Sequence, residues 1–331
     1  KEGSLHLLIG THAIIEEEVQ FANLGLAIID EQHRFGVAQR AALWKKNSTP
    51  PHILVMTATP IPRTLAMTVY GEVDISVIDE LPPGCKPITT VHRTEYRRPE
   101  VMKFIKEQIH QGRQAYIVYP LIEESEKMDY ENLMKGYEEV KAFFPEPAYH
   151  ISMVHGRQAN EIRSTNMQRF VQGITPVMVA TTVIEVGVNV PNATIMVMES
   201  AEKFGLSPLH QLSGRVGRGA DQSYCILMTA NDISREAKQR IKVMTDTNNG
   251  FVIAEKDMEL RGPGEMEGTR QSGALNFKLA DIIADKSILE AARQCAEKIL
   301  EQDPALALLE HVGLHDFLAT EKSKAAWSKI S

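Results

Sequence analysis

The stretch LGLAIID, residues 24–30, is a nearly unbroken apolar run that ends in a carboxylate. Two further runs, ILVMT at residues 53–57 and PVMVAT at residues 176–181, each end in a threonine. Strands of a parallel sheet read as continuous apolar runs because helices cover both faces of the sheet. We therefore predict an α/β fold built on parallel sheets, in which polar residues at the carboxyl ends of the strands face the ligand crevice.

Apolar runs and helical spacing alternate along most of the chain. Strands are expected at residues 7–10, 24–30, 53–57, 114–119, 150–154, 176–181, 194–198 and 224–228. Helices are expected at residues 34–46, 99–111, 132–143, 160–172, 233–246 and 251–260, and residues 279–331 are expected to be helical as well. The segment DELPPGCKPITT, residues 79–90, holds three prolines and a glycine and is the predicted linker between two domains.

The bulk composition is that of an ordinary globular protein. Its 331 residues suffice for two or three domains. Because the net charge is −7, contact with nucleic acid must depend on a local surface. Cys85, Cys225 and Cys295 match no metal-binding spacing and are expected to be free thiols. We see no signal peptide and no apolar run near the ~20 residues that cross a membrane, so a cytoplasmic location without a membrane partner is expected.

Asp30 and Glu31 follow the first long apolar run, and Thr57 and Thr59 follow the next one. Paired carboxylates at a strand end suit phosphoryl transfer, because one can hold Mg²⁺ through water while the other polarises the attacking water. The threonines can hydrogen-bond the acid pair and relay its state to a second domain. On their own, they would read equally well as helix caps.

Arg215 and Arg218 follow Gln211 in the segment QLSGRVGR, residues 211–218. We expect both arginines on the first turn of a helix, where a spacing of three makes them point the same way. Guanidinium groups match a γ-phosphate and, when a second domain supplies them, act as arginine fingers. The plain alternative is a solvated basic helix face.

Two other strand ends carry residue types that hold nucleic-acid phosphates without reading sequence. Thr181 and Thr182 begin one of them, and His155 and Arg157 follow the other. For His155 alone, a capped turn is the simpler interpretation.

A glycine-rich loop, GPGEMEGTRQSG at residues 262–273, follows Arg261. So many glycines allow close approach of the backbone to a ligand, although a disordered connection has the same composition. Arg261, Arg270 and Gln271 are candidates to engage a phosphate backbone or a neighbouring domain.

These parts of an ATP-driven motor occur without a phosphate-binding loop, because the sequence has no GxxxxGK[ST] segment. We therefore expect the chain to be a portion of a longer protein, and we expect it not to hydrolyse ATP alone.

Several segments together resemble the superfamily-2 DNA helicases of the RecG type. They are DEQHRFGVAQR at 30–40, TATPIPRT at 57–64, PLIEES at 120–125, ATTVIEVGVNVPNA at 180–193 and LHQLSGRVGRG at 209–219. The segment DMELRGPGEMEGTRQSG, residues 257–273, looks like the translocation motif of that family. The resemblance extends from about residue 5 to about residue 290.

This resemblance implies an ATP-dependent translocase on double-stranded DNA that remodels branched DNA, by fork regression and Holliday junction migration, in recombination and repair. It implies RecA-like motor domains that enclose ATP and Mg²⁺, with residues 1–80 as the back half of the first and 85–230 as the second. Residues 231–331 would form a helical hairpin, the translocation loop and C-terminal helices. Branched or duplex DNA and a single-strand-binding protein are the expected partners of a monomer.

The family motifs also imply roles for individual residues. The catalytic group would be Asp30, Glu31, His33, Gln211, Arg215 and Arg218, with magnesium on Asp30 and the attacking water activated by Glu31. The nucleotide would contact Asp30, Glu31, Gly187, Asn189, Arg215 and Arg218. DNA binding and its coupling to ATP turnover would involve Thr57, Thr59, His155, Arg157, Thr181, Thr182, Arg261, Arg270 and Gln271.

The chain departs from the family pattern in three respects. Ser213 stands where the family usually has Arg, which removes a positive side chain. Asn189 stands where Asp is common and keeps hydrogen-bonding capacity without the charge. The wedge domain that the family uses at a branch is not in this sequence.

Three other interpretations stay open. The motor of a transcription-repair coupling factor shares the translocation loop, but Gln32 stands where its acid box is expected to carry a second Glu. An RNA helicase would lack the loop at 257–273. A nucleic-acid-binding module without catalytic activity is favoured only by the missing phosphate-binding loop.

Overall fold

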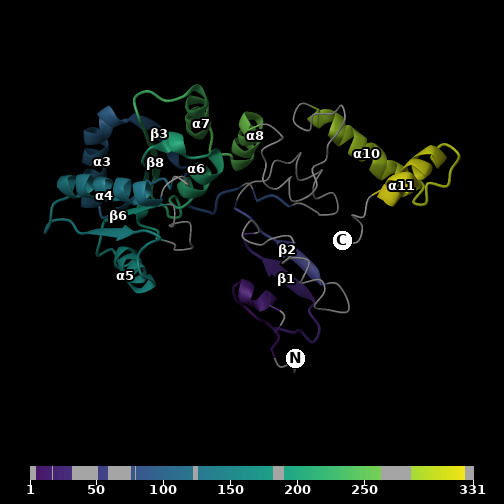
Figure 1. Ribbon diagram of the computed structural model, residues 1–331, viewed down its shortest axis with the longest axis horizontal. Helices are drawn as coiled ribbons and strands as arrows, with labels where there is room; N and C mark the ends of the chain where they lie inside the picture. The colour runs from purple at the N-terminus through teal and green to yellow at the C-terminus, as the bar shows by residue number, and fades with distance from the viewer. Residues whose placement is uncertain are drawn as a thin grey trace. The chain divides into compact units, whose positions relative to one another are not determined.

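The computed structural model describes residues 5–16, 18–31, 51–58, 76–78, 80–121, 126–181, 190–261 and 285–324. The chain divides into two compact units, one comprising Lys1–Gly71 with Pro263–Ser331 and the other comprising Glu72–Gly262. Figure 1 labels the elements of both units. The second unit carries the larger sheet.

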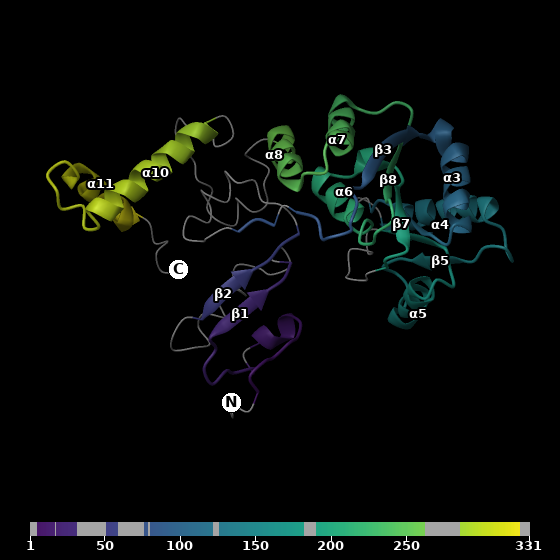
Figure 2. The same cartoon turned by 180° about the vertical axis from the view of Figure 1, so that it is seen from behind.

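Six parallel strands form the sheet of the second unit, in the order β3-β8-β7-β4-β6-β5. Figure 2 labels β3, β8, β7 and β5 of this sheet. They are β3 (Thr89–Thr94), β4 (Gln114–Tyr119), β5 (Ile151–Val154), β6 (Val177–Thr181), β7 (Ala193–Met198) and β8 (Tyr224–Thr229). Every neighbouring pair is parallel. The prediction of an α/β fold with parallel sheets is confirmed.

Helices cover both faces of this sheet. They are α3 (Arg98–His110), α4 (Glu126–Phe143), α5 (Asn160–Val171), α6 (Leu206–Ser213), α7 (Arg235–Asp246) and α8 (Gly250–Arg261), with the short turns η3 (Glu95–Arg97) and η5 (Ala201–Lys203). Ile117 and Val179 pack with side chains of α3 and α4 on one face. Tyr116 and Met178 pack with side chains of α5 to α8 on the other. This double cover explains why β4, β6 and β7 are buried at every position.

Two parallel strands are described in the first unit. β1 (Leu26–Ile29) pairs with β2 (His52–Val55), with Leu26 beside His52 and Ile29 beside Val55. The 3-10 helix η1 (His12–Ile15) places Ile15 against Ile29 in a small apolar cluster.

The described C-terminal part consists of α10 (Lys286–Gln302) and α11 (Val312–Lys324). Between them, the Asp303 carboxylate accepts backbone hydrogen bonds from Ala307 at 3.0 Å and Leu308 at 2.9 Å. It also pairs with Nδ1 of His311 at 3.0 Å. One carboxylate therefore organises the connection between the two helices.

Most predicted elements agree with the structure within a few residues. The strand predicted at 7–10 is wrong, because these residues adopt no regular structure. The strand β3 was not predicted, and α4 begins at Glu126 rather than at residue 132. The helix predicted at 34–46 and the loop at 262–273 lie outside the described residues. The domain limits at residues 80, 85 and 230 stay predictions.

Candidate functional site

The acid pair lies directly after β1. The backbone N–H of Glu31 donates to Oδ1 of Asp30 at 2.9 Å, and Glu31 has a φ of 53°. A left-handed backbone is uncommon for residues other than glycine and often occurs at functional sites. Asp30 is exposed. Its carboxylate is therefore accessible to a hydrated Mg²⁺, which commonly keeps several water ligands.

Thr57 lies at the same end of the β1–β2 pair as Asp30. The N–H of Met56 donates to the carbonyl of Ile29 at 2.8 Å, so the two chain segments stay side by side just beyond the paired strands. Thr57 is exposed. The structure thus brings the acid pair and the first of the two predicted coupling threonines to one edge, as adjacent parallel strands should.

Arg215 and Arg218 do not lie on the first turn of a helix, and that prediction is wrong. They follow the C-terminus of α6, which ends at Ser213. The N–H of Arg215 donates to the carbonyl of Leu212 at 3.0 Å, and Gly217 then takes a φ of 79°. A positive φ breaks a helix and favours glycine. A Cβ at Gly217 would also come within 2.8 Å of the Ile88 side chain.

The helix that precedes these arginines packs into the hydrophobic core. Leu206, Leu209 and Leu212 of α6 are fully buried. Burial raises the pKa of Tyr116 in β4 to about 12, while Arg215 and Arg218 lower it, so both guanidinium groups act on this phenol. Val216, which lies between the two arginines in sequence, is buried in one cluster with Leu212 and Tyr116, so the core anchors this segment.

Arg215 and Arg218 differ in their exposure to solvent. Arg218 is exposed and donates from Nε to the Gly214 carbonyl at 3.3 Å, whereas Arg215 and Gln211 are half-buried. Ser213, which replaces the usual Arg, is buried and donates its hydroxyl to the His210 carbonyl at 2.7 Å. Arg218 is thus the more accessible of the two cations for an anionic ligand.

His155 follows β5 and is only 8% exposed. Its N–H donates to the Gln158 side chain at 3.2 Å, and its ring packs edge-on against Tyr130 at 5.3 Å between centroids. Burial lowers the pKa of His155, and Arg157 lowers it further, so the imidazole is neutral near pH 7. Arg157 is exposed and lies over the Tyr130 ring at 5.4 Å. Of this pair, Arg157 is the better candidate for a phosphate contact.

Thr181 ends β6 and is 3% exposed. Among the described residues, its hydroxyl has no hydrogen-bond partner. In the register, Thr181 lies beside Tyr119 at the end of β4. Its proposed contact with DNA stays a prediction.

Sequence reasoning missed an ion pair under the carboxyl edge of the sheet. Arg98, the first residue of α3, binds Glu199 after β7 with two hydrogen bonds of 2.6 and 2.8 Å. Glu199 is 3% exposed and Arg98 is 19% exposed at the side chain. Burial opposes the charge on Arg98, but Glu199 outweighs it and keeps the pKa of Arg98 above its ordinary value. No local pattern could pair two residues so far apart in the sequence.

Several predicted site residues lie outside the residues that the structure describes. They are His33, Thr59, Thr182, Gly187, Asn189, Arg270 and Gln271, together with the side chain of Arg261 at the end of α8. Within the described ranges, no three His, Cys, Asp or Glu side chains gather closely enough to hold a metal ion by themselves. None of the helices described is long and apolar enough to cross a membrane.

Three protein families match successive parts of the chain. "DEAD/DEAH box helicase" matches residues 1–68, and "Helicase conserved C-terminal domain" matches residues 99–220. "ATP-dependent DNA helicase RecG, domain 3, C-terminal" matches residues 247–331. Together these matches include both the acid pair and the arginine segment.

Curated proteins named "ATP-dependent DNA helicase RecG" are similar to almost the whole chain. The protein from Synechocystis sp. is 52% identical over 306 residues, which are 92% of this chain and 36% of the relative. The Escherichia coli protein is 50% identical, over 93% of this chain and 45% of its own length. The Bacillus subtilis protein is 48% identical, over 96% of this chain and 46% of its own length. The chain thus spans less than half the length of these relatives.

Solved structures agree with these matches. The structure described as RecG bound to a three-way DNA junction is 43% identical, covers 85% of this chain and 36% of that protein, and has a TM-score of 0.65. A Saccharomyces cerevisiae Dbp5 variant bound to RNA and ADP–BeF3 covers 76% of this chain and 66% of its own, with 12% identity and a TM-score of 0.50. The second likeness concerns the fold alone, and it supports the prediction of RecA-like helicase domains.

Proposed function

The chain belongs to the RecG type of superfamily-2 DNA helicases, and from this membership we propose that it is the motor portion of an ATP-dependent DNA translocase that remodels branched DNA. One observation carries the proposal: about half of its residues are identical to those of curated RecG proteins over more than nine-tenths of its length. Fork regression and Holliday junction migration, in recombination and repair, are the activities we propose for the whole protein.

ATP and Mg²⁺ are the proposed cofactors. Asp30 would hold the magnesium through water, and Glu31 would take the proton of the attacking water as it reacts with the γ-phosphate. The exposed carboxylate of Asp30 and its hydrogen bond from the Glu31 backbone support this assignment. Magnesium would supply charge neutralisation at the phosphates.

The arginine segment, residues 211–218, would supply positive charge to the γ-phosphate. Arg218 and Arg215 would stabilise the γ-phosphate as its charge develops, and Gln211 would sense the nucleotide. The firm attachment of this segment to α6 and β4 supports a role that needs a fixed geometry.

Branched or duplex DNA is the proposed substrate, with a single-strand-binding protein as a further partner of a monomer. We place residues 1–80 in the first motor domain, 85–230 in the second and 231–331 in the coupling and C-terminal region. We also propose the cytoplasm as its compartment, because Cys85, Cys225 and Cys295 are free thiols and DNA is the substrate.

A catalytically inactive nucleic-acid-binding module is the second candidate, since the sequence has no GxxxxGK[ST] segment. Replacing the matched 45% of the Escherichia coli relative by this chain would separate the two candidates. The motor proposal expects DNA-stimulated ATP hydrolysis by the chimera. Forked-DNA binding without any hydrolysis would favour the inactive module.

In this chimera, Glu31→Gln should lower ATP turnover by roughly 100-fold or more, because it removes a general base. ATP binding should persist because the variant keeps Asp30. Lys135→Gln, at an exposed position on α4, is the control and should hydrolyse ATP normally. Normal turnover with Glu31→Gln would exclude the assigned base.

A further inference from the structure

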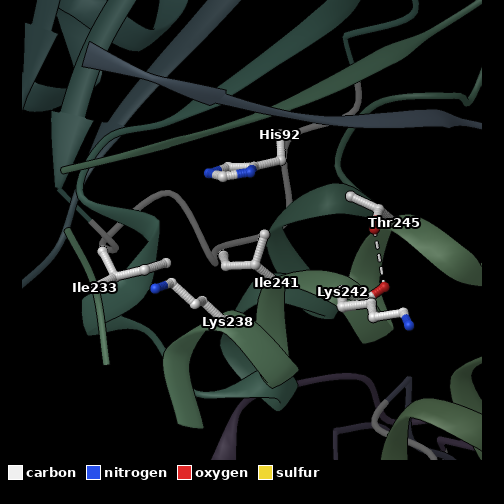
Figure 3. A pocket seen from close by; sticks show the side chains of 6 residues that line it. All are labelled: His92, Ile233, Lys238, Ile241, Lys242 and Thr245. Carbon is white, nitrogen blue, oxygen red and sulfur yellow. Dashed lines mark hydrogen bonds between the residues drawn. The ribbon is translucent and has the colours of Figure 1, made fainter. Parts of the chain in front are cut away.

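Two surface hollows of the second unit share the side chain of His92 on β3. One has a volume of about 420 Å³ and is lined by His92, Arg93, Thr94 and Arg97. The other, of about 190 Å³, lies between β3 and α7 and is shown in Figure 3. Its lining residues are His92, Ile233, Lys238, Ile241, Lys242 and Thr245. Arginine and threonine side chains thus line one side of His92, and lysines, a threonine and two isoleucines line the other.

Four cationic side chains border these hollows, and we call the surface that they form the β3–α7 surface. They are Arg93, Arg97, Lys238 and Lys242. Lys238 and Lys242 lie four residues apart on α7 and therefore emerge on one face of the helix. In Figure 3 the His92 ring lies across the smaller hollow from Ile241, and Lys242 extends away from it.

Acidic groups neutralise only part of this charge. Arg97 pairs with Glu100 at 2.9 Å, and Lys238 lies 4.0 Å from Asp232. Arg93 donates to the His92 carbonyl at 2.8 Å, a contact with no countercharge. Within the part of the chain that the structure describes, neither Arg93 nor Lys242 forms an ion pair. Both are exposed and can meet an anionic ligand.

His92 is a neutral spacer between the cations near pH 7. Thr229 donates its hydroxyl proton to the Ala230 carbonyl at 2.9 Å, so in the 2.8 Å bond between His92 Nε2 and Thr229 the imidazole is the donor. The neutral ring therefore carries its proton on Nε2. Burial lowers the pKa of His92 and Arg93 lowers it further, against the opposing effect of Glu202. The charge of the surface thus comes from its lysines and arginines.

The position of β3 in the sheet adds a geometric argument. β3 is at one end of the strand order, and β5, which leads to Arg157, is at the other. Five steps between neighbouring strands of about 4.8 Å make roughly 24 Å. Duplex DNA rises about 3.4 Å per base pair, so roughly seven base pairs span the carboxyl edge of the sheet. A duplex of this length laid along the carboxyl edge would be long enough to run from the end of β5 to the end of β3.

We propose that the β3–α7 surface holds the phosphodiester backbone of duplex DNA. This inference rests on the proposed function and locates a contact that the family motifs do not assign. Lysine, arginine and threonine side chains typically bind backbone phosphates and fix position without reading bases. Such contacts suit a translocase, which must move over any sequence. They also explain how a chain with a net charge of −7 binds DNA locally.

The test measures binding of a fluorescent duplex to the 331-residue chain by anisotropy over a range of salt concentrations. One variant is Lys238→Gln with Lys242→Gln, and a second is Arg93→Gln with Arg97→Gln. Each should reduce the slope of log affinity against log salt by about 1 to 2 and weaken binding to unrelated duplexes by a similar factor.

The matched control is Lys135→Gln with Lys141→Gln, two exposed lysines on α4, which covers the opposite face of the sheet from α7. This pair should leave the slope unchanged, and equal thermal melting curves would show that all variants fold. Slopes equal to the control in both test variants would overturn the proposal. Loss of binding to polyglutamate but not to the duplex would overturn it in favour of an acidic protein partner. No duplex binding by the unaltered chain would overturn the DNA-binding function itself.

Discussion

The strands β1 and β4 have similar sequences but different surroundings. Both are apolar runs, yet every residue of β4 is buried, whereas Leu26 and Ile28 of β1 are 56% and 58% exposed. β4 lies in the middle of a six-stranded sheet with helices on both faces, and β1 pairs with β2 in a two-stranded sheet among the described residues. An apolar run therefore predicts a strand, but burial, and the stability that follows from it, depends on neighbours.

Substituting one isoleucine in each strand gives the largest expected difference. Ile117→Ala in β4 removes a fully buried side chain and should cost about 3 kcal/mol, because the packed core cannot close the cavity. Ile28→Ala in β1 should change the free energy of unfolding by less than about 0.5 kcal/mol. Urea unfolding followed by circular dichroism measures both. Equal losses would mean that β1 is buried against parts of the protein outside the described residues.

Buried strands were predicted from the sequence more accurately than partly exposed ones. β4 and β6 were located to within a residue, because double-sided burial leaves an unbroken apolar run. β3, with the sequence TTVHRT, was missed because it is an edge strand. Such a strand is only partly buried, so most of its residues are polar and it contains no continuous apolar run. The strand predicted at residues 7–10 shows the opposite error, since this apolar run pairs with no strand among the described residues.

The candidate site was predictable in its residue types but not in its geometry. Asp30 and Thr57 lie at one edge because parallel strands end together, which a sequence can show. The backbone between Arg215 and Arg218 turns through the positive φ of Gly217, where a Cβ would meet the side chain of Ile88, a residue distant in sequence. The Arg98–Glu199 pair depends wholly on tertiary structure.

The Arg98–Glu199 ion pair is buried, whereas the Arg97–Glu100 pair close to it in sequence is exposed. Glu199→Gln leaves the Arg98 guanidinium beneath the sheet edge without its countercharge and should cost about 2 to 3 kcal/mol, somewhat less than for a fully buried pair. Glu100→Gln breaks the Arg97–Glu100 pair, whose side chains are 60% and 62% exposed, and should not change stability measurably. Thermal unfolding of both variants measures the difference. If Glu199→Gln did not change the melting temperature, the cost of burying the two charges would equal the stabilisation from their attraction.

Two glycines extend the comparison, with effects of opposite sign. A Cβ at Gly136 of α4 would overlap the ring and hydroxyl of Tyr119, so Gly136→Ala should destabilise by about 1 to 2 kcal/mol despite the helix propensity of alanine. A Cβ at Gly313 of α11 would meet nothing within 4 Å among the described residues outside its own helix turn, and Gly313→Ala should stabilise by up to about 0.5 kcal/mol. Melting temperatures should therefore move in opposite directions. A stabilising Gly136→Ala would show that Tyr119 can move aside.

Acidification should weaken the loop between α10 and α11, which is held by the carboxylate of Asp303. The Leu308 N–H, followed by the Ala307 N–H and His311, holds the pKa of Asp303 below its ordinary value of 3.8, against the effect of burial. A carboxyl group with a lowered pKa stabilises the fold above the unfolded value and loses this effect as the pH falls through the folded value. Amide exchange protection at Ala307 and Leu308 should therefore be constant from pH 7 to 5 and fall below about pH 3.8.

Two variants decide whether this pH dependence comes from Asp303 itself. Asp303→Asn places an amide N–H₂ where one of the backbone N–H groups needs an acceptor, so protection should be low at every pH and lose its dependence on acid. Glu310→Gln removes an exposed carboxylate 3.9 Å from His311 and should leave the profile unchanged. A profile altered by Glu310→Gln would instead place the sensitivity in the charge around His311. Because the Asp303 bonds join adjacent backbone groups, the effect should end within this loop, whereas Ile117 and Glu199 act through the whole sheet.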